Sequence, residues 1–230
     1  GIDFAFAYPV LDWDGSMCGY FPGYLHSPET AHDLWKLIDS VNAERPDLYG
    51  GGIWDHPQLG AYYNAPGGRR GTAFASRRRL AEQVAREVKS PSPTFNCVGP
   101  AGVGTGSLAG MRALHQLSSF AHIWPFDNPD TVSRPLHLVE IFPSYYFALA
   151  GIKPVNGAHG ERENINQALA CFGSDSVSAD FQANGPDHDE ADALISAAAL
   201  RWFSAQSDFW SVPADARAEG WIFGVKSAKP

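Results

Sequence analysis

An apolar segment headed by acidic residues constrains the fold of this chain more than any other feature. The segment 185–203 reads GPDHDEADALISAAALRWF, in which a nearly continuous apolar run follows a cluster of carboxylates. Gly185 and Pro186 are expected to break the preceding structure, and Asp187 and Glu190 form a pair that resembles a capping box. The pattern predicts a helix that is buried against a sheet.

Asp189 and Asp192 are the acids of this helix that bear most on function. Their spacing of three places both carboxylates on one helix face, close enough to share a cation. Acids in a first turn also complement the helix dipole, and this alternative explains Asp187, Asp189 and Glu190 well. It explains Asp192 less well, because Asp192 borders the apolar run, where an unpaired charge is costly. Both interpretations remain open from the residues alone.

The composition of the 230 residues indicates a globular protein. Hydrophobic residues make up 44% of the chain and aromatic residues 13%, which is enough to fill a sizeable core. The 25 Asp and Glu outnumber the 17 Lys and Arg, and the net charge of -8 argues against a protein that coats nucleic acid non-specifically. The longest apolar stretch, 193–200, is shorter than the ~18 residues of a membrane span, so no membrane partner is expected.

The three cysteines bear on the compartment. Cys18, Cys97 and Cys171 are widely spaced and show no zinc-type spacing. Unpaired cysteines of this kind fit a reducing environment, so we predict a cytoplasmic protein. The sequence gives no indication of the oligomeric state.

Two acids lie within predicted strands. The segment 2–8, IDFAFAY, is rich in strand formers and ends at Pro9, and its one charge is Asp3. Asp3 either lies in water at a frayed strand end or faces a functional site. The second alternative requires another acidic cluster to lie close to Asp3. Glu140 lies within the predicted strand 136–142, LHLVEIF, where it either pairs with an arginine at a sheet edge or contributes to a site.

A basic cluster stands out against the acidic background. Its members are Arg69, Arg70, Arg77, Arg78, Arg79 and Arg86. The segment 77–89 has helical character, so some of these arginines share a face. They either form a solvated helix side with ion pairs to Glu82 and Glu87 or hold phosphates beside the long loop 45–71. On the second interpretation the partner is nucleic acid, and the phosphate ligands are Arg77, Arg78 and Arg79.

A glycine-rich segment, 94–111, predicts a short strand, a turn and a helix. Backbone N–H groups before a helix N-terminus can cradle an anion, although a tight structural turn explains the glycines equally well. The segment matches neither a P-loop nor a nucleophile elbow. The candidate phosphate-binding residues are Gly104, Thr105, Gly106 and Ser107. Further strands are predicted at 122–126 and 219–225, and further helices at 27–41 and 161–172.

Several motifs, taken in order, resemble an uncharacterised predicted-nuclease family of the RNase H-like superfamily. They are GIDFAFAYP, RxxE at Arg79 to Glu82, VGTGSLAGM, IWPFD, VEIFP, DEADALISA and EGWIF. The helix motif DEADALISAAA also resembles the last acidic helix of RuvC-type Holliday-junction resolvases. These motifs span nearly the whole chain.

The resemblance implies an α/β fold in which helices flank a mixed five-stranded sheet. Acids on the first strand, the fourth strand and a late helix then hold two divalent metal ions for in-line attack of water on phosphate. By motif, Asp3 matches the fourth-strand acid and Asp189 and Asp192 match the helix pair, while Glu140 matches a family position of unassigned role. The first three strands would precede Gly1. We therefore expect one RNase H-like domain over residues 1–230 that lacks its N-terminal strands, with 45–71 as a long loop insertion.

On this basis the sequence favours a nuclease that depends on Mg²⁺ or Mn²⁺. Its metal ligands would be Asp3, Asp189 and Asp192, with Glu140 as a further catalytic residue, and hard oxygen ligands suit these metals. The alternative is a non-catalytic nucleotide- or phosphate-binding protein of the same fold. A metal-independent hydrolase built on Ser107 has little support.

Overall fold

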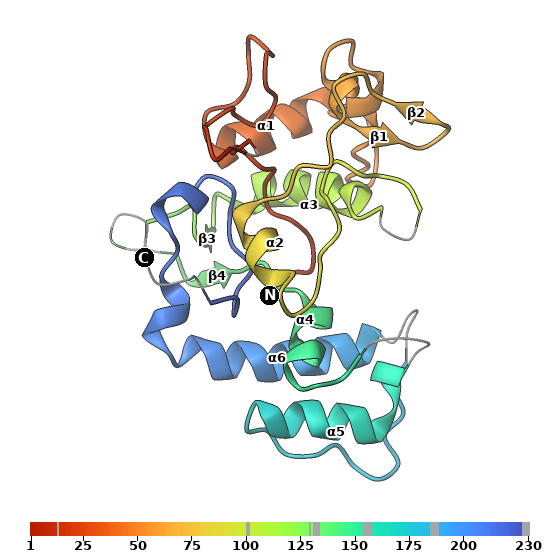
Figure 1. Cartoon of the computed structure of the whole chain (residues 1–230), viewed down its shortest axis with the longest axis vertical. Coiled ribbons are helices and arrows are strands. Elements are labelled where there is room, and N and C mark those ends of the chain that lie inside the picture. The colour runs from red at the N-terminus through yellow and green to blue at the C-terminus, as the bar shows by residue number, and fades with distance from the viewer. Residues whose placement is uncertain are drawn as a thin grey trace.

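A computed structural model describes residues 1–12, 14–99, 102–128, 130, 134–153, 158–184 and 189–226. In this part of the chain the fold is mixed α/β, with six α-helices and two small two-stranded sheets (Figure 1). The helices are α1 (Ala31–Val41), α2 (Leu80–Ala85), α3 (Gly104–Leu117), α4 (Pro143–Leu149), α5 (Arg162–Cys171) and α6 (Asp189–Ser204). The strands are β1 (Asn64–Ala65), β2 (Arg69–Arg70), β3 (Ala121–Ile123) and β4 (Leu136–Leu138). Short 3-10 helices are η1 (Gly51–Asp55), η2 (Leu59–Tyr62), η3 (Ala158–Gly160), η5 (Ser207–Trp210) and η6 (Ala214–Ala216).

The centre of the molecule is a small parallel sheet. Strands β3 and β4 pair in parallel, and beyond β4 the chain continues to Glu140. Glu140 forms parallel bridges with Ile2 from the start of the chain and with Ile222 from near its end. The Ile2 N–H donates to the Val139 carbonyl at 3.0 Å, and the Phe223 N–H donates to the Glu140 carbonyl at 2.9 Å. Successive carbonyls of a strand point to opposite sides, so the two end segments flank Glu140.

The prediction of a full strand over residues 2–8 is wrong. Only Ile2 bridges to the sheet, and the segment that follows is irregular. Its N–H groups bond to side chains and not to a neighbouring strand: Ala5 donates to Ser107 Oγ at 3.3 Å and Phe6 donates to Glu140 Oε2 at 3.0 Å. The predicted strand 219–225 is likewise reduced to one bridge. The described residues form no five-stranded sheet, so an RNase H-like arrangement remains a prediction.

The acidic helix is confirmed as α6, although the partner on which it packs differs from the prediction. α6 lies mainly against helices α4 and α5 and less against a sheet (Figure 1). Its buried residues are Ala191, Ile195, Ser196, Ala198, Ala199 and Phe203. The predicted break at Gly185 and Pro186 and the cap at Asp187 lie outside the described residues.

Helices α1 and α2 follow their sequence signals with shifted ends, whereas α4 was not predicted. α1 begins four residues later than predicted, because Thr30 is its N-cap and accepts a hydrogen bond from the Asp33 N–H at 3.1 Å. Its buried face packs on α3. The helical character predicted over 77–89 is limited to α2. The segment 45–71 is not a structureless loop, since it contains η1, η2 and the antiparallel β1–β2 hairpin.

Two hydrophobic cores lie on either side of the central strand. One, the C-terminal core, contains residues of α4, α5, α6 and 221–225, and the other, the N-terminal core, contains residues of 6–10, α1 and α3. Leu138 belongs to the N-terminal core, whereas Val139 and Ile141 belong to the C-terminal core, as the alternation of side chains along a strand requires. None of the helices in the described ranges is long and apolar enough to cross a membrane.

Candidate functional site

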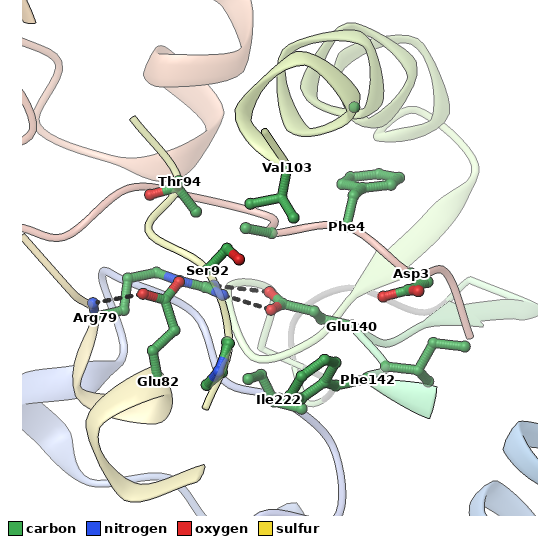
Figure 2. A pocket seen from close by; sticks show the side chains of 14 residues that line it. Asp3, Phe4, Arg79, Glu82, Ser92, Thr94, Val103, Glu140, Phe142 and Ile222 are labelled. Atoms are coloured by element: carbon green, nitrogen blue, oxygen red, sulfur yellow. Dashed lines mark hydrogen bonds and ion pairs between the residues drawn. The ribbon is translucent and has the colours of Figure 1, made fainter. Parts of the chain in front are cut away.

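Glu140 and Arg79 form the centre of a buried charge network (Figure 2). Arg79 donates from Nη1 to Glu140 Oε2 at 2.7 Å and from Nη2 to Glu140 Oε1 at 2.5 Å, a bidentate pairing. Arg79 Nε also donates to Glu82 Oε1 at 2.8 Å. Only 1% of the surface of Arg79 is exposed, and each of its three guanidinium nitrogens donates to a protein acceptor. We name Arg79, Glu82, Glu140 and Glu219 the Arg79 network.

Glu219 extends this network to three separate segments. Its carboxylate accepts hydrogen bonds from the N–H groups of Val10 at 2.6 Å, Leu11 at 3.0 Å and Leu80 at 2.7 Å. The last of these satisfies a free N–H in the first turn of α2. Glu219 thereby ties the N-terminal segment and α2 to the end of the chain. This role could not be predicted from neighbouring residues, because the partners lie about 139 and 209 positions away.

The pKa shifts of the network follow from burial and pairing. Burial alone would lower the pKa of Arg79, but its ion pairs with Glu140 and Glu82 outweigh burial and raise that pKa above its ordinary value. Burial raises the pKa of Glu82, and the neighbouring Arg79 offsets part of this rise. The network is therefore a set of mutually compensated charges, and its members favour a structural role.

The arginines predicted to hold phosphate have protein partners. Arg77 is buried, donates to the Tyr20 carbonyl at 2.9 Å and to Cys18 Sγ at 2.8 Å, and lies over the ring of Phe95. Arg78 is half-buried and donates to the Pro91 carbonyl. Together with the pairing of Arg79, these contacts supply acceptors for all three guanidinium groups. Phosphate binding by them stays a prediction.

The glycine-rich segment is likewise occupied by internal contacts. The Gly104 N–H donates to the Asn96 carbonyl at 2.9 Å, and a Cβ at Gly104 would lie 2.3 Å from the Thr94 carbonyl oxygen. Thr105 Oγ1 donates to the Cys97 carbonyl at 3.3 Å. Gly104 is therefore required by close packing, which favours the structural-turn interpretation.

Ser107 and Gly106 differ in their surroundings. Ser107 Oγ donates to the Val103 carbonyl at 3.1 Å and accepts from the Ala5 N–H, so its hydroxyl is engaged with backbone groups. This engagement leaves no support for a hydrolase built on Ser107. Gly106 has open space around it and lines a cavity near Asp3. Anion binding at either residue stays a prediction.

Asp3 lies at the meeting point of two cavities. One, of about 250 Å³, is also lined by Arg79, Glu82 and Glu140. The other, of about 410 Å³, is also lined by Asp189, Asp192 and Ser196 of α6, and we name it the acidic cavity. Figure 2 shows Asp3 on the N-terminal segment, beside Glu140. The structure thus brings the three acids that the sequence singled out as metal ligands to one cavity, although α6 is remote from Asp3 in sequence.

The carboxylate of Asp3 is held in an unfavourable electrostatic environment. The surrounding protein displaces much of its water although one side is open to solvent, and this desolvation, followed by the charges of Asp192 and Glu140, raises the pKa of Asp3 to about 7. No described residue donates a hydrogen bond to its carboxylate or forms an ion pair with it. A cation in the cavity would relieve this repulsion.

Ser196 is a site residue that the sequence reasoning missed. It follows Asp192 by four positions and therefore lies on the same face of α6. Ser196 lines the acidic cavity, is 2% exposed, and its hydroxyl has no hydrogen-bond partner among the described residues. Its signal was a polar side chain within the apolar run.

Among the described residues no group of three or more His, Cys, Asp and Glu side chains is arranged to hold a metal ion.

Comparisons of the chain with protein-family models, with curated proteins and with solved structures found no match.

Proposed function

We propose that the acidic cavity binds Mg²⁺ or Mn²⁺ and that the chain is a metal-dependent nuclease with an RNase H-like fold. The observation that carries the proposal is the convergence of Asp3 with Asp189 and Asp192 on one cavity, where Asp192 raises the pKa of Asp3. Bringing like charges together costs free energy, and perturbed carboxylates in a cavity are typical of functional sites.

The donor set fits a hard cation that keeps part of its hydration shell. Mg²⁺ is commonly held by one or two carboxylates, with water and substrate phosphates as its other ligands. Asp3 and Asp192 would supply the two carboxylates, since the charge of Asp192 is near enough to raise the pKa of Asp3. Asp189 and the buried hydroxyl of Ser196 line the same cavity and are available to order the coordinated water.

Asp3, Asp192 and Glu140 can each be given a role in such a reaction. A bound ion would supply Lewis-acid stabilisation of charge on the phosphoryl oxygens. Asp3 and Asp192 would hold the ion and orient the scissile phosphate by way of it. Glu140 acts through the backbone, because its bond to the Phe6 N–H fixes the segment that carries Asp3. It is therefore a positioning residue.

The test is a calorimetric titration of Mn²⁺ into the full chain and into Asp192→Asn. We expect the substitution to weaken binding by at least about tenfold, which is about 1.4 kcal/mol. Glu190→Gln is the matched control, since it also removes a first-turn carboxylate of α6 but does not line the cavity. The control is expected to bind Mn²⁺ within about twofold of the parent chain.

Cleavage of fluorescent single-stranded and branched DNA is then measured with and without Mn²⁺. Metal-dependent cleavage that Asp192→Asn abolishes supports the nuclease. Mn²⁺ binding without cleavage would withdraw the hydrolase and leave the alternative of a nucleotide- or phosphate-binding protein. Equal Mn²⁺ affinity of the parent chain and Asp192→Asn would overturn the ion site itself.

A further inference from the structure

A third cavity, which shares no lining residue with the acidic cavity, has an aromatic wall. Its volume is about 750 Å³, within the range of small-molecule binding sites. The apolar wall is formed by Trp124, Pro125, Phe126, Trp210 and Val212. The rings of Trp124 and Trp210 lie edge to face, with centroids 6.0 Å apart and planes at 85°. Indole faces and edges arranged in this way present a surface that accepts a planar aromatic ring.

Two histidines from the central sheet also line this cavity. His122 of β3 and His137 of β4 are register partners, and their ring centroids are 4.8 Å apart. His122 is 2% exposed, and neither of its ring nitrogens has a hydrogen-bond partner among the described residues. Burial, and then the neighbouring His137, lowers the pKa of His122, which disfavours the charged form of its imidazole. A buried imidazole without partners is costly, and a ligand in the cavity can supply a partner.

Arg217 is the cationic group of the cavity lining. Its side chain is exposed, and within the described ranges it makes no hydrogen bond or ion pair. The carboxylate of Asp127 does not compete for it, because Asp127 accepts from the Ile123 N–H at 2.8 Å and from Arg134 at 3.2 Å. Asp130 also lines the cavity but is exposed, so water screens its charge. A free guanidinium of this kind matches a carboxylate in bidentate geometry.

We propose that this cavity binds a planar aromatic carboxylate. The ring packs against Trp124 and Trp210, the carboxylate pairs with Arg217, and the imidazole of His122 lines the same cavity. The proposal is independent of the metal site, because the two cavities share no lining residue.

The test uses 2-naphthoate as the probe and measures its binding to the full chain by ligand-observed NMR and calorimetry. Two analogues separate the contributions: 2-naphthylmethanol keeps the ring without the charge, and cyclohexanecarboxylate keeps the charge without the aromatic ring. We expect each analogue to bind at least about tenfold more weakly than 2-naphthoate. Equal binding of the neutral alcohol, or no detectable binding of 2-naphthoate, would overturn the proposal.

Two substitutions locate the probe in this cavity. Arg217→Gln is expected to weaken 2-naphthoate binding about tenfold and to leave binding of 2-naphthylmethanol unchanged. Trp210→Leu is expected to weaken binding of both naphthyl compounds, because it removes part of the aromatic wall. Arg86→Gln is the matched control, since it removes an exposed arginine that does not line the cavity. An unchanged affinity of Arg217→Gln for 2-naphthoate would refute the assignment, and thermal unfolding verifies that each variant is folded.

Discussion

Glu140 and Asp3 lie on neighbouring segments, since Glu140 bridges to Ile2 and Asp3 follows Ile2, yet their carboxylates have different surroundings. Glu140 is buried and accepts hydrogen bonds from both terminal nitrogens of Arg79 and from the Phe6 N–H. Asp3 has no described donor, and Asp192 is one of the groups that raise its pKa. The difference distinguishes acids that stabilise a fold from acids that leave room for a ligand. Satisfied carboxylates, however deeply buried, are poor candidates for binding sites.

The largest change in stability is expected when the cation of the Arg79 network is removed, which tests whether its carboxylates depend on that cation. Arg79→Met leaves the carboxylates of Glu82 and Glu140 buried without their partner. We expect the free energy of unfolding to fall by about 3–5 kcal/mol, measured by urea denaturation followed by circular dichroism. Arg86→Met, at an exposed position, is expected to change it by no more than about 0.5 kcal/mol.

A double variant addresses the possibility that Arg79→Met does not fold. Replacing Arg79 with Met and Glu140 with Leu removes both partners of the bidentate pair and leaves one fewer uncompensated charge. Part of the lost stability is expected to return. A double variant that is less stable than Arg79→Met would contradict mutual compensation within the network.

Glu219 offers a smaller perturbation of the same network. Glu219→Gln keeps the size of the side chain but replaces one accepting oxygen by an NH₂ group, which cannot accept from the N–H groups of Val10, Leu11 or Leu80. We expect the free energy of unfolding to fall by about 2 kcal/mol, because hydrogen bonds to a charged group are lost. Urea denaturation is again the measurement. Glu44→Gln, at an exposed turn position, provides the comparison, and an equal effect there would argue against the role of Glu219.

The smallest effect concerns Asp3 and appears as a dependence of stability on pH. The pKa of Asp3 rises on folding from 3.8 to about 7. Between these values the unfolded chain has lost the proton that the folded chain retains, so the stability contributed by Asp3 is highest at low pH. That contribution falls as the pH rises through this window and is constant above about pH 7.

Comparing the parent chain with Asp3→Asn isolates this contribution. The other titrating groups are present in both proteins, so their contributions cancel in the difference. We expect the difference in unfolding free energy, parent minus variant, to decrease from about pH 4.5 to about pH 7.5. The change is expected to be smaller than the effects at Arg79 and Glu219, because solvent reaches one side of Asp3. A pH-independent difference would show that Asp3 titrates normally.

The helices other than α4, which was not predicted, could be predicted largely from the sequence because their signals are local. α5 and α6 lie within a residue or a few residues of their predicted bounds, and α1 differs mainly at its start. The strands β3 and β4 lie where apolar patterns placed them but are shorter. The segment 2–8 was mispredicted, because its N–H groups bond to side chains more than a hundred positions away.

The candidate site also contains some residues that could be predicted from the sequence and others that could not. Asp3, Asp189 and Asp192 could be singled out because each acid interrupts or borders an apolar run, and they do line one cavity. Their metal binding stays a prediction. The environment of Arg79 could not be read from its neighbours, because Glu140 is 61 positions away and a solvated cluster has the same local pattern. Ser196 was overlooked because its one signal, a polar side chain within the apolar run, does not distinguish a site residue from any other helical serine.

The double pairing of Glu140, to Ile2 on one side and to Ile222 on the other, has a consequence for biosynthesis. The ribosome releases the first of these partners early and the last only after most of this sequence has been translated. Until then, the edge of the Glu140 segment that Ile222 covers is open to other chains. Assembly of the centre is therefore a late event on the nascent chain. The helix-rich parts, whose contacts are closer in sequence, are free to form before it.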